Sequence, residues 1–154
     1  MILYFIIAIL ITAIDQILKL LTVSNLKGKS DISLLNGLLK FTYVENRGAA
    51  FGILKGAKYL FILLVILLLI FYLYVMLKKK FDSKLLKWGL SLILGGGIGN
   101  AIDRLILGFV IDYIRVSFFP PVCNFADYCI TIGTALVLIY ICFGKVKNQG
   151  KILK

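Results

Sequence analysis

Four long apolar blocks constrain this chain more than any other feature of its sequence. Each is near the ~20 residues that an α-helix needs to cross the ~30 Å hydrocarbon core of a bilayer. The blocks run over residues 2–21, 59–77, 88–107 and 127–143. Hydrophobic residues make up 61% of the chain, well above the share in soluble domains. We therefore predict a mainly α-helical membrane protein with four transmembrane helices, built as a single domain over residues 1–154.

The distribution of lysines predicts how these helices are oriented, because cytoplasmic loops are enriched in Lys and Arg. The short loop between the second and third blocks holds Asp82 and five lysines, Lys78, Lys79, Lys80, Lys84 and Lys87. The C-terminal tail holds no acid and four lysines, Lys145, Lys147, Lys151 and Lys154. Both segments should be cytoplasmic, which places both termini inside. The net charge of +11 thus indicates topology and contact with anionic lipid, and we expect no nucleic-acid partner.

Two segments, residues 22–58 and 108–126, lie outside the membrane in this topology. The first contains KFTYVEN, a strand-like run that is followed by the turn signal Arg47-Gly48. The second contains VIDYIRVSF, which is rich in β-branched and aromatic residues. A small extracytoplasmic β segment resting on the bilayer fits both.

Four of the seven acidic residues lie inside or at the rims of the apolar blocks: Asp15, Asp103, Asp112 and Asp127. An acid at the centre of a span costs roughly 2.5–3.5 kcal/mol on insertion scales, so each position requires a reason. At 1.5 Å per residue, Asp103 lies about 22 Å along the third block from Trp88, and thus toward its outer end. The other three acids also fall on the outer side, which predicts one polar cluster at that rim.

Two groups of polar residues lie within the spans. Asp15 and Lys19 are four residues apart and share a helix face. They form either an intrahelical ion pair or a contact with catalytic groups. Asn100, Asp103 and Arg104 lie close together in the third block and must face protein or a water-filled cleft. They form either a structural network or part of a substrate site.

Asp112 and Asp127 lie on separate elements that should meet at the outer rim. Two carboxylates brought close together share one proton, so that one can activate water while the other polarises a carbonyl and later protonates a leaving amine. Two ordinary acids at helix ends, with Asp127 favoured by the helix dipole, are the alternative.

Other chemistry finds little support. The chain has no histidine, which excludes Ser-His and Cys-His nucleophiles and removes the commonest zinc ligand. Its three cysteines, Cys123, Cys129 and Cys142, lack metal-ligand spacing, so we expect no metal and no cofactor. The glycine cluster at 95–99 is typical of close helix packing and lacks the pattern of a nucleotide loop.

Five blocks, taken together and in this order, resemble the lipoprotein signal peptidases, also called type II signal peptidases. They read DQILK from Asp15, NRGAAFG from Asn46, GGGIGNAIDR from Gly95, VIDY from Val110 and NFAD from Asn124. The resemblance implies a four-span aspartic peptidase of the bacterial plasma (inner) membrane, acting as a monomer with its active site at the outer face. Its substrates would be prolipoproteins, whose signal peptide is removed just before a diacylglyceryl-modified cysteine.

The resemblance also implies roles for individual residues. It makes Asp112 and Asp127 the catalytic pair. Residues that would support the site or hold substrate are Asp15, Lys19, Asn46, Gly48, Asn100, Asp103, Arg104, Asn124 and Ala126. Two positions depart from the family pattern: Phe119 stands where Trp is often seen, and Cys123 stands where Phe usually precedes the Asn. Both departures concern the shape of the lipid-side pocket.

Two other functions remain open at this point. A small proton-coupled transporter would use Asp15 and Asp103 as relay acids near the bilayer midplane. A structural membrane subunit would use its acids only to pair with Lys19 and Arg104.

Overall fold

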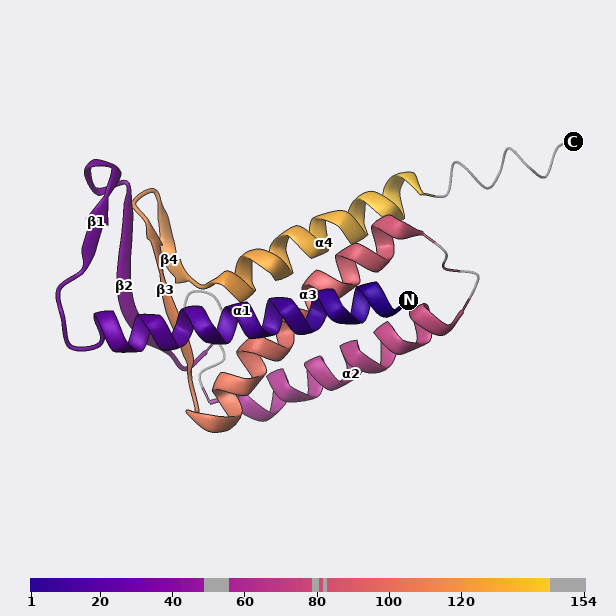
Figure 1. Ribbon diagram of the computed structural model, residues 1–154, viewed down its shortest axis with the longest axis horizontal. Coiled ribbons are helices and arrows are strands. Elements are labelled where there is room, and N and C mark those ends of the chain that lie inside the picture. Colours follow the sequence, from indigo (N-terminus) through magenta and orange to yellow (C-terminus); the bar gives the residue numbers. More distant parts are fainter. Residues whose placement is uncertain (49–55, 79–80, 82, 145–154) are drawn as a thin grey trace, which may run out of the picture.

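The computed structural model describes residues 1–48, 56–78, 81 and 83–144 (Figure 1). It contains four long helices, α1 (Ile2–Leu26), α2 (Lys58–Leu77), α3 (Lys84–Ile106) and α4 (Phe125–Phe143). All four are long and apolar enough to cross a membrane. The predicted fold class is thereby confirmed.

Helix boundaries differ from the predicted blocks by up to five residues. Helix α1 continues to Leu26, so Asp15 lies near its middle rather than toward the outer end that the block 2–21 indicated. Helix α3 begins at Lys84, four residues before Trp88, because the Ser83 side chain accepts a hydrogen bond from the Leu86 N–H and caps the helix. Polar helix ends carry no hydropathy signal, which is why the apolar blocks alone missed them.

Helix α3 is the centre of the bundle, although it is the least apolar of the four. Its glycines allow close approach of the neighbouring helices: a Cβ on Gly95 would lie 2.8 Å from the Ala8 carbonyl oxygen of α1. A Cβ on Gly96 would lie 2.5 Å from the Ala126 carbonyl oxygen of α4. The predicted role of the glycine cluster in helix packing is therefore confirmed.

A four-stranded antiparallel sheet lies at one end of the bundle. Its order is β1 (Ile32–Leu34), β2 (Leu39–Asn46), β3 (Val110–Val116) and β4 (Phe119–Cys123). Strands β2 and β3 correspond to the two predicted strand-like runs. Strands β1 and β4 were not predicted. β1 has only three residues, and β4 contains Pro120-Pro121, which are tolerated because β4 is an edge strand.

The sheet and the turn between α2 and α3 lie at opposite ends of the molecule (Figure 1). Met1 and the end of α4 lie at the same end as that turn, together with Lys78, Lys84 and Lys87. Lys79, Lys80, Asp82 and the four tail lysines, which also entered the topology prediction, fall outside the described residues.

Candidate active site

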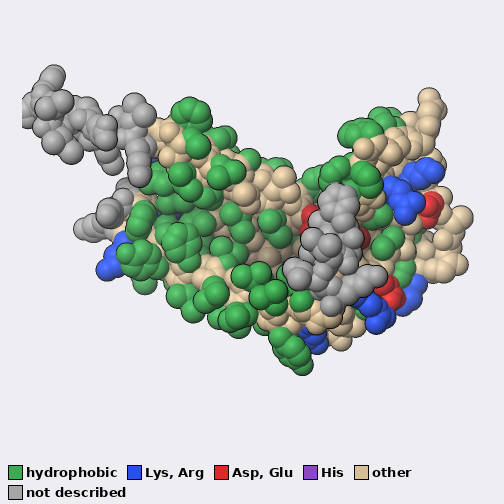
Figure 2. Space-filling view, turned by 180° about the vertical axis from the view of Figure 1, so that it is seen from behind, with side chains coloured by type: hydrophobic (Ala, Val, Ile, Leu, Met, Phe, Trp, Pro, Cys, Tyr) green, Lys and Arg blue, Asp and Glu red, His purple; other side chains and the backbone are tan. Residues whose placement is uncertain are grey.

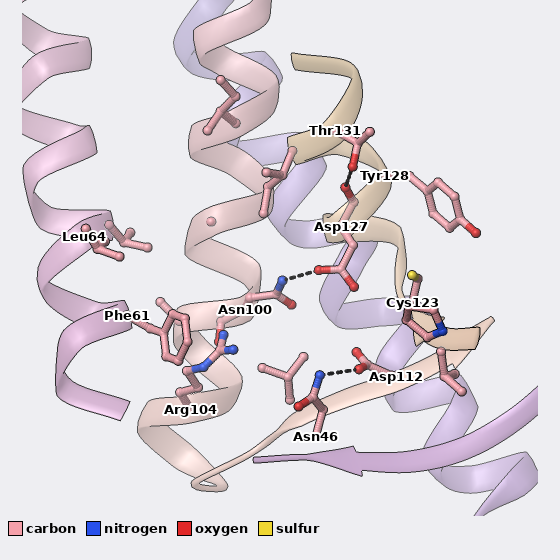
Figure 3. Close-up of a pocket in the computed structure, with 18 of the residues that line it drawn as sticks. Asn46, Phe61, Leu64, Asn100, Arg104, Asp112, Cys123, Asp127, Tyr128 and Thr131 are labelled. Carbon is pink, nitrogen blue, oxygen red and sulfur yellow. Dashed lines mark hydrogen bonds between the residues drawn. The ribbon is translucent and has the colours of Figure 1, made fainter. Parts of the chain in front are cut away.

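Asp112 and Asp127 come from elements that meet where the sheet joins the helices (Figure 3). Asp112 lies on β3 and is 2% exposed. Asp127 lies in the first turn of α4, where the backbone N–H of Asn124 donates to its Oδ2 over 3.0 Å. The Asn124 side chain accepts in return from the Asp127 N–H at 3.0 Å, so that the pair forms a capping box at the start of the helix.

Three asparagine side chains donate to the two carboxylates. Asn46 donates to Asp112 Oδ2 at 2.8 Å, and Asn124 donates to Asp112 Oδ1 at 2.6 Å. Asn100 donates to Asp127 Oδ1 at 2.9 Å. Asn124 thus contacts both acids, and it joins them into one hydrogen-bonded unit.

The orientation of each amide group follows from a donor on its oxygen. The Gly48 N–H donates to Asn46 Oδ1 at 2.9 Å, and Lys19 Nζ donates to Asn100 Oδ1 at 2.9 Å. The Asn124 oxygen accepts from a backbone N–H in the same way. Because an ammonium or a backbone N–H can only donate, each oxygen is identified and each NH₂ group faces a carboxylate.

Lys19 lies behind the Asn100 amide, between two further acids, and is only 1% exposed. Its Nζ is 2.7 Å from Asp15 Oδ2 and 3.0 Å from Asp103 Oδ2. Asp15 also accepts from the Ala126 N–H at 3.1 Å, and Asp103 accepts from the Ile111 N–H at 3.0 Å. The intrahelical pair and the structural network, which the sequence left as separate possibilities, are parts of one cluster.

Arg104 connects α3 to the segment that follows β2. Its guanidinium donates to the carbonyl oxygens of Asn100 at 3.3 Å and Gly48 at 2.8 Å. Its carbon Cζ lies 4.2 Å from the ring centroid of Phe61 on α2, within cation–π range. The NRGAAFG block continues beyond Gly48 into residues 49–55, which fall outside the described part of the chain.

A cavity of about 620 Å³ opens beside the two acids. Its walls come from the helices α2, α3 and α4 and the strands β2, β3 and β4, and Figure 3 shows the carboxyl groups pointing into it. The wall contributed by α2 is entirely apolar, with Phe61, Leu64, Val65 and Leu68. Phe119 and Cys123, the two departures from the family pattern, both line this cavity.

The pKa values of two side chains on the sheet, Asp112 and Cys123, are shifted by burial beside the cavity. Burial, together with the charge of Asp127, raises the pKa of Asp112 to about 7, against the opposing hydrogen bonds from Asn46 and Asn124. Burial and the nearby acids raise the pKa of the Cys123 thiol to about 11. Asp112 is therefore poised to carry a proton near neutral pH, whereas the thiol is a poor nucleophile there.

Three residues of the network were absent from the predicted site. Gln16 donates to Asp103 Oδ1 at 3.0 Å and to the Gly99 carbonyl oxygen at 3.1 Å. Tyr113 accepts from the Phe125 N–H at 3.2 Å, and Phe61 stacks on Arg104. Gln16 and Tyr113 each adjoin a predicted site aspartate, which was an available signal. Phe61 lies in a uniformly apolar block and had none.

Comparisons with known proteins agree with this arrangement. The family model described as signal peptidase (SPase) II matches residues 7–143. The chain is 38% identical to a lipoprotein signal peptidase of Clostridioides difficile, covering 96% of this chain and 99% of that protein. It is 41% identical to a lipoprotein signal peptidase of Lactobacillus johnsonii, covering 95% and 96%. A solved bacterial membrane enzyme aligns with a TM-score of 0.83 at 30% identity, covering 94% of this chain and 90% of that one.

Proposed function

Because this chain belongs to the signal peptidase II family and is therefore a peptidase of prolipoprotein signal peptides, we propose how and where it cuts. It acts as an aspartic endopeptidase on diacylglyceryl-modified prolipoproteins and cleaves just before the lipidated cysteine. Asp112 and Asp127 are the catalytic pair. Membership of a peptidase family leaves the transporter and the structural subunit without support.

One observation carries this proposal: two carboxylates joined through Asn124 face the same apolar cavity. Close acids share a proton, and a shared proton provides a base and an acid without a metal or a cofactor. The remaining predicted residues have supporting roles, since Asp15, Lys19 and Asp103 hold the asparagines and backbone beneath the pair. Gly48 and Ala126 take part through their backbone groups.

We assign the resting proton to Asp112 and the negative charge to Asp127. Asp112 is buried, and its pKa of about 7 allows it to hold a proton near neutral pH. Asp127 lies at the start of α4, where the helix dipole favours a negative charge. The pair thus separates into an acid and a base through the surroundings of its two members.

Catalysis then follows from these two states. The Asp127 carboxylate accepts a proton from a water molecule, whose oxygen attacks the carbonyl carbon of the scissile bond. The Asp112 carboxyl group donates its proton to the carbonyl oxygen, giving a neutral tetrahedral diol. Asp127, and not the acid that polarised the carbonyl as the sequence analysis suggested, passes its new proton to the amide nitrogen. The C–N bond then breaks, and Asp112 recovers its proton from the diol as the new carboxyl group forms.

The position of the cavity suits a lipid-anchored substrate. It lies at the sheet end of the bundle, and its α2 wall is apolar. The acyl chains of a lipidated cysteine must remain in the bilayer, so its scissile bond lies near the membrane surface. We place this end at the outer face of the bacterial plasma membrane and both termini in the cytoplasm, with membrane lipid around a monomer. Lys78, Lys84 and Lys87 lie in or beside the short connection between α2 and α3 at the opposite end. They support this topology because short loops follow the positive-inside rule most closely, whereas the longer segment 22–58, which also carries lysines, follows it less strictly.

The test is cleavage of a synthetic diacylated precursor peptide by purified protein in detergent micelles. Asp112→Asn and Asp127→Asn should each lower kcat by at least about 10³-fold, because each removes one half of the acid–base pair. Asp31→Asn, which changes an exposed acid outside the site, is the matched control and should cleave normally. Retention of cleavage by both site variants would show that the pair is wrong, and Asp103 would then become the leading candidate.

A further inference from the structure

The sheet has two chemically different faces along its outer half. Strand pairing places Ile32 opposite Phe41, and Leu34 opposite Leu39. The register continues from Leu39 to Val116 and from Phe41 to Ile114. Because paired residues point to the same side of a sheet, these side chains form one surface. We call it the apolar sheet face, defined by Ile32, Leu34, Leu39, Phe41, Ile114 and Val116.

The opposite face is polar at the same level. Ser33 pairs with Lys40, and Lys40 pairs with Arg115. A hydroxyl group and two cations therefore lie on the face opposite the apolar sheet face. Arg115 is exposed. A sheet with one solvated face normally packs its apolar face on a core. The apolar sheet face is instead open at its outer end, where Ile32 is 49% and Leu34 is 42% exposed.

The turns beside this face expose further apolar side chains. Leu35, in the turn from β1 to β2, is 70% exposed and has a φ of 51°, in the left-handed region that a leucine rarely adopts. Leu38, at the end of that turn, is 45% exposed, and Phe118, between β3 and β4, is 78% exposed. Gly or Asn would suit the backbone at Leu35 better, so the hairpin itself does not account for the leucine.

The apolar sheet face is turned toward the helices. Asp112 lies on the same side of β3 as Ile114 and Val116, and it lines the cavity together with Phe119 and Cys123 of β4. In the space-filling view the molecule is hollowed between helices and sheet, and hydrophobic side chains border this hollow on both sides (Figure 2). The face therefore continues the exposed apolar surface of the helices, whose outward side chains include Leu67, Ile132 and Ile139.

We propose that the apolar sheet face and its two turns insert into the outer leaflet of the bilayer and anchor the sheet at a set depth over the catalytic pair. The occupant is phospholipid acyl chain. Lys40 and Arg115 on the opposite face remain at the level of water and anionic headgroups, as amphipathic interfacial elements do. The anchor holds Asp112 at the height of a lipidated cysteine.

Fluorescence quenching in vesicles tests this depth directly. The chain has a single tryptophan, so Trp88→Phe gives a silent background. Leu34→Trp is then compared with the matched Ser33→Trp, which lies one residue away on the polar face. Both proteins are reconstituted at high lipid excess into phosphatidylethanolamine–phosphatidylglycerol vesicles whose acyl chains carry bromine near the headgroup.

The two tryptophans should respond in opposite ways. At position 34 we expect blue-shifted emission, strong quenching by brominated lipid and protection from aqueous iodide; at position 33 we expect the reverse. Ile32→Trp provides a second reporter on the same face if Leu34→Trp does not fold. Equal iodide quenching at 33 and 34 overturns the proposal.

Other occupants would leave distinct signatures, each of which also overturns the proposal. Protection at position 34 that appears only after a precursor peptide is added would identify a substrate surface. Protection that disappears on dilution of the protein in the bilayer would identify a second copy of the chain. The readout requires no cleavage, so it is independent of the assignment of the catalytic pair.

Discussion

Asparagine amides, rather than charged side chains, hold the two carboxylates of the candidate pair. An amide donor stabilises a carboxylate less than a cation does, so it positions the acid without fixing its charge. Lys19 does not line the cavity. It donates to the Asn100 oxygen, and the Asn100 amide in turn donates to Asp127, so Lys19 influences the pair only through this asparagine. This arrangement leaves Asp112 able to hold a proton near neutral pH.

Removing the Asn46 donor should shift the pH dependence of cleavage. The hydrogen bond from Asn46 lowers the pKa of Asp112 from what burial alone would impose, so Asn46→Leu should raise that pKa above about 7. In our mechanism Asp112 must be protonated, and activity is lost as pH rises through its pKa. The alkaline limb of the kcat profile should therefore move to higher pH in the variant.

The control for this experiment is Asn25→Leu, which removes an exposed amide at the end of α1. Its pH profile should coincide with that of the unmodified protein. An alkaline limb that stays in place in Asn46→Leu, or moves to lower pH, would contradict the assignment of the proton to Asp112.

At the scale of elements, the glycines of α3 bring three helices close enough for these hydrogen bonds to form. The same helix carries Asn100, Asp103 and Arg104, which bond to α1, α4 and the segment after β2. A Cβ on Gly99 would meet the Asp15 carboxylate, so the polar cluster begins where the glycine contacts end. Packing and chemistry thus depend on one helix.

Gly96→Ala should lower the thermal stability of the protein, whereas Gly97→Ala should leave it unchanged. The Cβ at Gly96 would meet the backbone oxygen of Ala126 at 2.5 Å, pushing the start of α4 and Asp127 away. Overpacking of this kind costs about 1–3 kcal/mol, and we expect a lower thermal midpoint in detergent together with reduced kcat. The Cβ at Gly97 would meet only side-chain methyls at 3.4 Å or more, so its thermal midpoint should hold. Equal stability of the two variants would show that the close contact of α3 and α4 is not required.

At the scale of the whole molecule, the buried cluster around Lys19 connects α1, α3, α4 and β3, which are far apart in the sequence. Through Asp15 and Asp103 it reaches the N–H of Ala126 at the start of α4 and that of Ile111 at the start of β3. Two acids in an apolar bundle are tolerated because the ammonium group between them offsets one of the two negative charges, and the backbone N–H groups of Ala126 and Ile111 donate to the carboxylates.

Lys19→Met should therefore destabilise the protein strongly. It leaves two buried carboxylates without a cation, and breaking a buried ion pair in this way costs about 3–5 kcal/mol. Thermal unfolding in detergent, followed by circular dichroism, should show a large drop in midpoint. Lys29→Met, which changes an exposed lysine after α1, should leave the midpoint within about 2 °C. A small effect at Lys19 would mean that solvent or a shared proton replaces the cation.

The features that depend on local pattern and on the bilayer could be predicted from the amino-acid sequence. Hydropathy located the four spans because apolar length is a direct requirement for crossing lipid. The cost of burying a carboxylate singled out Asp15, Asp103, Asp112 and Asp127. Strands β2 and β3 could be predicted because the composition of their residues is typical of strands.

How these parts meet depends on contacts between segments that are distant in the sequence. Asn46 and Asn124 reach the same carboxylate from 66 and 12 residues away, a convergence that no local spacing encodes. Strand β1 and the proline-containing β4 exist because β2 and β3 provide partners for them. The apolar sheet face arises from the register of three strands, and register is a property of pairing between distant segments.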